Sequence, residues 1–271
     1  MALNVKRILI LIEKDWVDIS KSKYVMMSII GIPFLMAILM PLSMVAPFTF
    51  MSEEEAEEET LPYLDELPSP IPNWDELSTH QQSIVTMVYF SHLFFLIIPC
   101  ILPSVIAADS IAGEKERKSF EAILATPLTD TEILIGKIGT PFLIGMLGTF
   151  IGAVPYVILT NFFTYPVLDF IVVPDLNFIL LLLLLSPATG LLTAIGMVFV
   201  SSRVSSTRDA QQLGGLIVLP LLLFLFGQIV LAFFSPLTIL IGAGIFGLID
   251  FLLFRMALKI FSREGIITKY T

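Results

Sequence analysis

The sequence predicts an all-α integral membrane protein with six transmembrane helices and with both termini in the cytoplasm. The first observation is composition: 56% of the 271 residues are hydrophobic and only 14% are charged, which is less charge than soluble domains carry. The second is a series of long charge-free runs, each able to cross the hydrocarbon core as a helix. The third is that every Lys and Arg falls on one side of these runs, and basic residues beside membrane spans stay in the cytoplasm.

The charge-free runs place the six spans within a single transmembrane domain, 1–271. Asp, Glu, Lys and Arg are absent from residues 24–52, 77–108, 138–168, 176–202 and 210–249. The last run has 40 residues, enough for two helices of about 20 residues each. Ser235 and Pro236 divide it, because Ser caps helices and Pro suits the first helical position. The expected spans are 24–48, 83–108, 136–163, 176–201, 212–234 and 236–257.

Residues 3–21, before the first span, predict an interfacial amphipathic helix. The apolar residues at helical spacing are Leu3, Ile8, Leu11, Ile12, Trp16 and Ile19. Charged residues fill the other side of this helix. A helix with a basic face and a Trp is typical of a segment lying in the membrane interface with lipid. A cytoplasmic helix packed on another part of the protein is the alternative.

Residues 51–82 predict an acidic extracytoplasmic loop. Positions 53–59 hold six Glu and one Ala, and four prolines follow. Like-charge repulsion and proline both resist a packed fold, so a solvated loop is expected. A cation-attracting mouth or a contact with a partner is the alternative. The loop lacks the ligand spacing of a calcium site, and we expect no metal site in the chain.

Residues 109–135, the coupling segment, predict a short helix on the cytoplasmic side. Helix formers run from about 114 to 125, and the capping box Thr129-x-x-Glu132 begins the third span. A helix here places Arg117, Phe120 and Glu121 on one face. An exposed aromatic residue beside charges suits docking into a groove of a cytoplasmic partner. An ordinary charged loop with its Phe at the membrane interface is the alternative from composition alone.

Two stretches of the chain carry motifs of a known kind. The coupling segment and the residues after it contain Gly113-Glu-Lys-Glu116, then Phe120-Glu-Ala-Ile-Leu-Ala-Thr-Pro127, then Gly136-Lys137. This series resembles the cytoplasmic motif of the type-2 ABC transporter permeases, the membrane subunits of ATP-driven exporters. Residues 201–220 are similar to the loop between spans four and five in permeases of the sodium-exporter group. The resemblance covers essentially the whole chain.

The resemblance implies a permease subunit of an ABC exporter in a prokaryotic plasma membrane. Two such chains, identical or related, would pair as a dimer around the translocation path. Each would dock a separate cytoplasmic ATP-binding subunit, which holds the ATP and Mg²⁺, so this chain itself needs no cofactor. Nucleic acid is not an expected partner. The residues expected to couple ATP-driven motion to the spans are Glu114, Glu116, Arg117, Phe120 and Glu121.

Polar residues inside spans are candidate pathway residues, because they are costly in lipid. Asp250 lies near the cytoplasmic end of the last span, where it would pair with a base or mark a cation or proton pathway. Asn161 and Gln228 lie towards the outside, where hydrogen bonds between helices are the simpler interpretation.

The chain lacks the motifs of the enzymes that it would otherwise resemble. It has no Gly-x4-Gly-Lys-Ser/Thr phosphate loop, and no acid stands between His80 and His92, so no His-Glu-x-x-His zinc motif is present. We therefore expect a non-catalytic subunit. A six-span sensor or assembly protein that binds an extracellular partner is the alternative. The cargo stays open among cations, lipid-like molecules and hydrophobic peptides or drugs.

Overall fold

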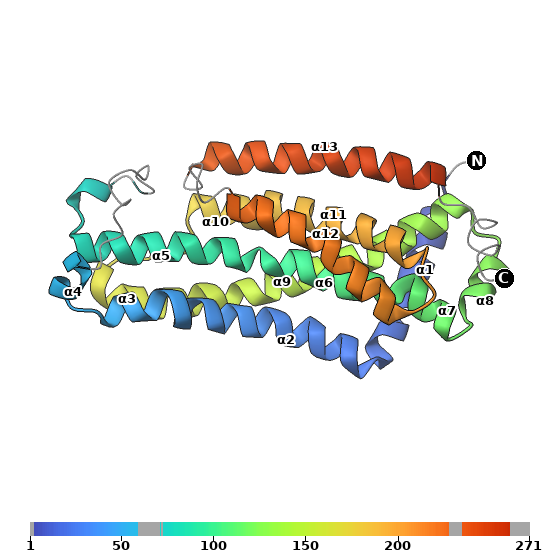
Figure 1. Cartoon of the computed structure of the whole chain (residues 1–271), viewed down its shortest axis with the longest axis horizontal. Helices are drawn as coiled ribbons and strands as arrows, with labels where there is room; N and C mark the ends of the chain where they lie inside the picture. The colour runs from blue at the N-terminus through green and yellow to red at the C-terminus, as the bar shows by residue number, and fades with distance from the viewer. Residues whose placement is uncertain (1–2, 59–70, 72, 228–234, 261–271) are drawn as a thin grey trace.

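A computed structural model of the chain describes residues 3–58, 71, 73–227 and 235–260. All regular secondary structure in these residues is helical, and the long helices lie lengthwise in one elongated bundle (Figure 1). The predicted all-α architecture is therefore confirmed. One end of the bundle carries α7 (Glu114–Glu116) and α8 (Phe120–Leu124), and we call it the α8 end. The opposite end carries α4 (Glu53–Glu58), and we call it the α4 end.

Five helical stretches among the described residues are long and apolar enough to cross a membrane. They are Lys23–Phe50, Thr79–Glu116, Asp130–Leu168, Leu176–Ser201 and Pro236–Lys259. These correspond to the first four expected spans and the sixth. In the place of the fifth, α12 (Thr207–Gly227) runs along the bundle beside α11 (Ser186–Ser201) (Figure 1). Because residues 228–234 lie outside the described part, the count of six spans stays a prediction.

Three of the long helices contain wider π-helical turns. α2 (Lys23–Met40) passes through η1 (Pro41–Val45) into α3 (Ala46–Phe50). α10 (Leu176–Leu180) passes through η5 (Leu181–Leu185) into α11, whose second residue is Pro187. Proline lacks the N–H that the α-helical ladder needs, and a π-turn beside it absorbs the interruption. The third is the second long helix, Thr79–Glu116. It consists of α5 (Thr79–Phe95) and α6 (Ile97–Ala108), and its π-turn η4 (Asp109–Gly113) leads into α7.

Local capping chemistry sets where three of the helices begin. Ser78 and Gln81 form the reciprocal capping box of α5, and Thr129 and Glu132 form that of α9 (Asp130–Leu168). The hydroxyl of Ser235 accepts a backbone hydrogen bond in the first turn of α13 (Pro236–Ile260). The starts predicted for α9, at the Thr129 capping box, and for α13, at Ser235 and Pro236, are therefore confirmed.

The single helix predicted for residues 114–125 is wrong. The chain takes a left-handed conformation at Lys118, with φ of 55°. The amides of Lys118 and Ser119 donate to the carbonyls of Lys115 and Glu114, both at 2.9 Å. This is a Schellman motif, which ends the helix that began at Thr79 and turns the chain before α8. The second long helix, whose span was expected to end at residue 108, thus extends through α7 to Glu116.

α1 (Val5–Lys21) lies against the first turns of α9 at the α8 end. Its buried face consists of Ile8, Leu11, Asp15 and Ile19. A Cβ added at Gly136 of α9 would lie 2.6 Å from a methyl carbon of Leu11, so the two helices are in close contact. The outward face of α1 exposes Trp16 together with other apolar residues and charges. α1 is therefore packed on another part of the protein, while its location in the cytoplasm or at the membrane interface stays a prediction.

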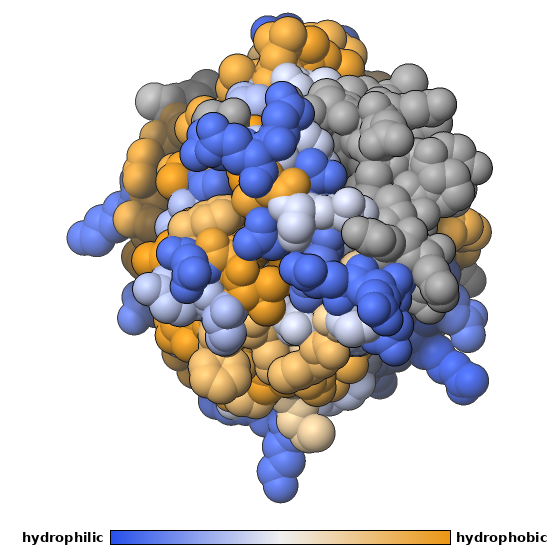
Figure 2. Space-filling model, turned by 90° about the vertical axis from the view of Figure 1, so that its left-hand side faces the viewer, coloured by the Kyte–Doolittle hydropathy of each residue, from blue (hydrophilic) through white to orange (hydrophobic). Residues whose placement is uncertain are grey.

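Charge separates between the two ends of the bundle. All Lys and Arg of the described residues lie at the α8 end or in the helix turns next to it, whereas Glu53–Glu58, Asp169 and Asp175 lie at the α4 end. Figure 2 looks onto the α4 end, where hydrophilic residues gather near the centre and hydrophobic residues lie mainly above, to the left of and below them. Large apolar side chains such as Ile30, Ile151 and Leu248 are exposed along the sides. An apolar belt between two polar ends is typical of a membrane-spanning bundle.

Close contact between α6 and α9 leads to a prediction about Gly145. An added Cβ there would lie 2.5 Å from Cγ of Pro103, a rigid ring that cannot rotate away. Gly145→Ala should lower stability by about 1–3 kcal/mol, the usual effect of overpacking. Gly31→Ala is the matched control, because an added Cβ at Gly31 meets nothing within 4 Å. Melting in mild detergent checks this, and equal melting temperatures for the two variants would contradict the packing.

Candidate functional site

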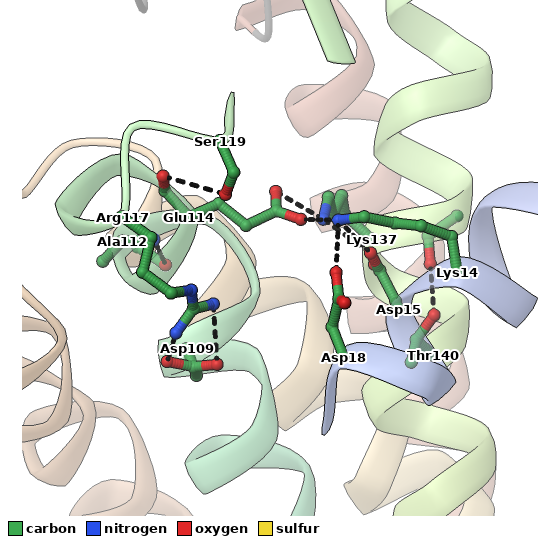
Figure 3. Close-up of polar contacts among 12 residues, drawn as sticks. Lys14, Asp15, Asp18, Asp109, Ala112, Glu114, Arg117, Ser119, Lys137 and Thr140 are labelled. Carbon is green, nitrogen blue, oxygen red and sulfur yellow. Dashed lines mark hydrogen bonds and ion pairs between the residues drawn. The ribbon is translucent and has the colours of Figure 1, made fainter. Parts of the chain in front are cut away.

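A fully buried ammonium group joins three helices at the α8 end. Lys137, near the start of α9, is 0% exposed. Its Nζ donates to Oδ1 of Asp15 in α1 at 3.0 Å and to Oε2 of Glu114 in α7 at 2.7 Å. Figure 3 shows the two carboxylates converging on this amine from different helices. Glu114, the first acid of the Glu-x-Glu motif in the coupling segment, is therefore bonded to a buried lysine of the same chain.

Lys14 completes this arrangement on its more exposed side. Its Nζ pairs with Glu114, with Asp15 at 3.3 Å and with Asp18 at 3.0 Å. We call Lys14, Asp15, Glu114 and Lys137 the ion cluster. It contains two ammonium groups and two carboxylates, so its formal charge is balanced. Because a buried charge without its partner is strongly destabilising, each member holds the other three in place.

Burial and neighbouring charges shift the proton affinities of the groups that α1 contributes. Burial raises the pKa of Asp15, and the nearby carboxylate of Glu114 adds to this, although Lys137 opposes both. Burial would lower the pKa of Lys14, but its bond to Glu114 more than compensates and holds the pKa above the ordinary value. Lys14 therefore keeps its positive charge at neutral pH.

The next contact of the coupling segment is an ion pair that depends on a glycine. Nη1 and Nη2 of Arg117 donate to the two carboxylate oxygens of Asp109, at 3.1 and 3.2 Å. A Cβ added at Gly113 would lie 2.1 Å from Oδ1 of Asp109 and 3.1 Å from Nη1 of Arg117. The absence of a side chain at Gly113 therefore leaves the space in which this bidentate pair forms.

The same segment is also bonded to the connection between α11 and α12. Nζ of Lys115 donates to the carbonyls of Ser202 and Val204, at 2.7 and 3.1 Å. The carboxylate of Glu116 accepts from the amide and the hydroxyl of Thr207, each at 3.0 Å. Residues 114–116 therefore connect α1, α9 and the start of α12 through side chains of their own.

The structure divides the predicted coupling residues into two groups. Glu114, Glu116 and Arg117 are bonded inside the chain, as described above. Phe120 is 2% exposed and packs in the apolar core of the α8 end, so the expectation of an exposed aromatic residue is wrong. Glu121 on the same short helix is exposed. A role for these five residues in coupling stays a prediction.

The predicted intramembrane polar residues have separate surroundings. Asp250 forms no ion pair within the described residues, so the expected pairing with a base is not found there. Oδ1 of Asn161 accepts from the amides of Val172 and Val173, at 3.0 and 3.3 Å. The side chain of Asn161 is therefore hydrogen-bonded to the loop that follows its own helix, instead of to a neighbouring span. Gln228 lies outside the described residues.

Asp15 and Lys137 were not among the residues singled out from the sequence, yet they form the centre of the site. The signal for Asp15 was available, because this acid occupies the buried stripe of α1 between Leu11 and Ile19. An acid on the apolar face of an amphipathic helix needs a buried partner. Lys137, which belongs to the Gly136-Lys137 element of the family resemblance, is that partner.

The apolar belt, the charged ends and the helical bundle define a multi-pass membrane protein. The model of the family described as "ABC-2 family transporter protein" matches residues 51–252, so the chain belongs to the ABC-2 transporter family as a permease component. Permeases of this family are generally non-catalytic membrane subunits that work with an ATP-binding subunit. No curated protein and no solved structure matches the chain significantly.

The ion cluster predicts a large loss of stability in Lys137→Met. Met has an apolar side chain of similar length to Lys, but without the Lys137 ammonium group the two buried carboxylates must share Lys14. Breaking a buried ion pair lowers stability by about 3–5 kcal/mol. Lys21→Met is the control, because the side chain of Lys21 is 71% exposed. Melting in mild detergent measures both. Adding Glu114→Gln to Lys137→Met should restore part of the loss, and a Lys137→Met variant as stable as Lys21→Met would contradict the cluster.

The raised pKa of Asp15 predicts a specific pH dependence. The folded state binds the proton of Asp15 more tightly than the unfolded state, whose pKa is about 3.9. The contribution of Asp15 to stability therefore falls as the pH rises from about 4 through the folded-state pKa. The melting temperature of the wild type, relative to Asp15→Asn, should decline over that range.

Asp18 supplies a control of opposite sign for this pH experiment. Although burial opposes it, the hydrogen bond from Lys14 lowers the pKa of Asp18. Its contribution is therefore present above about pH 4 and is lost as the pH falls below that value. If Asp15→Asn and Asp18→Asn changed with pH in the same direction, the assignment of Asp15 as the buried member would be wrong.

Proposed function

We propose that this permease is the membrane subunit of an ATP-driven exporter and that it docks a separate ATP-binding subunit at the α8 end. A second permease chain would pair with it to enclose the translocation path. The ATP and Mg²⁺ would be held by the docked partner, and this chain would remain non-catalytic. The observation that carries the proposal is the bonding of residues 114–116 to α1, α9 and α12 directly beside the exposed face of α8.

This bonding supports a mechanical role for the α8 end. A partner that displaced α8 would also displace α7, because only the tight turn at residues 117–119 separates the two helices. The ion cluster would pass that movement to α1 and α9, while Lys115 and Glu116 would pass it to α12. Since packed interfaces tend to switch between discrete arrangements, a small shift there could reorient several spans together.

The distribution of charge supports the location of the partner. Basic residues near span ends remain in the cytoplasm, and the described Lys and Arg lie at or next to the α8 end. That end would therefore face the cytoplasm of a prokaryotic cell, where ATP is available. The acidic residues of the α4 end, Glu53–Glu58 among them, would face outwards.

Glu121→Lys tests the docking surface without disturbing the core. The side chain of Glu121 is exposed, whereas Phe120 is buried, so Phe120→Asp would damage folding instead. We expect a soluble ATPase to co-purify with the tagged wild-type chain in mild detergent. Reversing the charge of Glu121 should reduce its recovery by about tenfold or more, because a misplaced charge at an interface costs several kcal/mol.

Glu53→Lys is the matched control, since Glu53 is an exposed acid at the opposite end. It should retain the ATPase, which mass spectrometry identifies and quantifies. Absence of any ATPase from the wild-type sample would argue against the exporter and favour a sensor or assembly protein. Full recovery with Glu121→Lys would place the docking surface elsewhere.

A further inference from the structure

A pocket separate from the ion cluster lies between α9, α11 and α13. Its volume is about 570 Å³, within the range of about 300–1,000 Å³ that small-molecule sites occupy. α9 contributes Phe142 and Ile138, α11 contributes Leu191, and α13 contributes Asp250 and Phe254. Asp250 is the only lining residue with a polar side chain.

Asp250 is poorly compensated in this position. The residue is 4% exposed, and its Oδ1 has no hydrogen-bond partner in the described part of the chain. A carboxylate surrounded by apolar groups is unfavourable unless it is hydrogen-bonded or paired with a positive charge. The nearest base along its own helix, Arg255, is exposed and its guanidinium lies 5.0 Å from the ring centre of Phe251. Within the described part of the chain, the pocket therefore has a buried acid without a basic partner.

We propose that this pocket binds a hydrophobic organic cation, a small molecule with an apolar body and one positive charge. The carboxylate of Asp250 would pair with the charge, which removes the unfavourable state of the unpaired acid. The rings of Phe142 and Phe254 would contact the apolar body and attract the cation through their faces. Charge complementarity and the apolar lining thus select the same class of ligand.

Other ligand classes fit these residues less well. A dehydrated metal ion needs several oxygen ligands, and the described residues contain no cluster of three or more His, Cys, Asp or Glu side chains that would hold one. An organic anion would be repelled by Asp250. A neutral lipid chain would fill the apolar space but would leave the carboxylate without a partner.

The inference concerns binding to this chain alone and stands apart from the docking of an ATPase. It is tested with the purified full-length chain in nanodiscs of phosphatidylcholine, which carries no net charge. Radiolabelled tetraphenylphosphonium is the probe, and tetraphenylborate is its anion of nearly equal shape. We expect saturable binding of the phosphonium and no competition by the borate. Absence of saturable phosphonium binding, or equal binding of both ions, would overturn the proposal.

Two variants test the acid and the space separately. Asp250→Asn keeps the shape of the side chain and should weaken phosphonium binding by about tenfold or more, because it removes a desolvated charge pair. Gly247→Leu should also weaken binding, because Gly247 lines the pocket and an added Cβ there meets nothing within 4 Å. Unchanged affinity in Asp250→Asn would overturn the assignment of the carboxylate.

Each variant has a matched control in the same chain. Asp209→Asn neutralises an exposed acid at the start of α12 and should bind the phosphonium like the wild type. Gly244→Leu adds the same side chain to α13 at another open position that does not line the pocket. Equal loss of binding in Gly244→Leu and Gly247→Leu would show a general effect on α13 and would overturn the location.

Discussion

The buried ammonium group of Lys137 is the constraint on which the architecture of the α8 end depends. In apolar surroundings its charge must be matched, and the matching carboxylates come from α1 and from the end of the second long helix. α1 cannot leave α9 without exposing this imbalance, and the helix that began at Thr79 must extend past residue 108 to deliver Glu114. The left-handed turn at Lys118 then ends that helix and lets α8 fold back against the core.

The four residues from Gly113 to Glu116 show why a short motif can belong to the interior of a transport subunit. Gly113 provides space for an ion pair, Glu114 bonds to Lys137 of α9, and Lys115 and Glu116 both bond to the connection that leads from α11 into α12. The charges of this motif are therefore used within the chain, and the exposed face of α8 is the surface at which we propose that the ATP-binding subunit docks. A rigid junction next to a small exposed helix is a suitable arrangement for converting a movement at the surface into a movement of whole spans.

Features of this structure that depend on neighbouring residues could be predicted from the sequence, whereas features that depend on contacts between distant residues could not. Charge-free runs, the capping box at Thr129 and the Ser235-Pro236 pair are local, so the long helices and the starts of α9 and α13 could be predicted. The helix break at Lys118 could not, because the residue is not a glycine and its conformation follows from how Glu114 and Phe120 are held elsewhere. Among the described residues Asp250 lacks the expected pairing with a base for a geometric reason: five positions along a helix correspond to a rotation of about 140°, which directs Arg255 away from the acid.

The chain thus contains two buried ionic environments with opposite balance. In the ion cluster, two carboxylates meet two ammonium groups, so the formal charges balance within the fold, as a permanent structural joint requires. At Asp250 a single carboxylate lies among apolar side chains, and the described residues supply no charge to match it. An acid in such a position lowers stability unless something else compensates it. The first environment is explained by the folded chain alone, whereas the ligand that we propose for the second would supply the charge that the described residues lack.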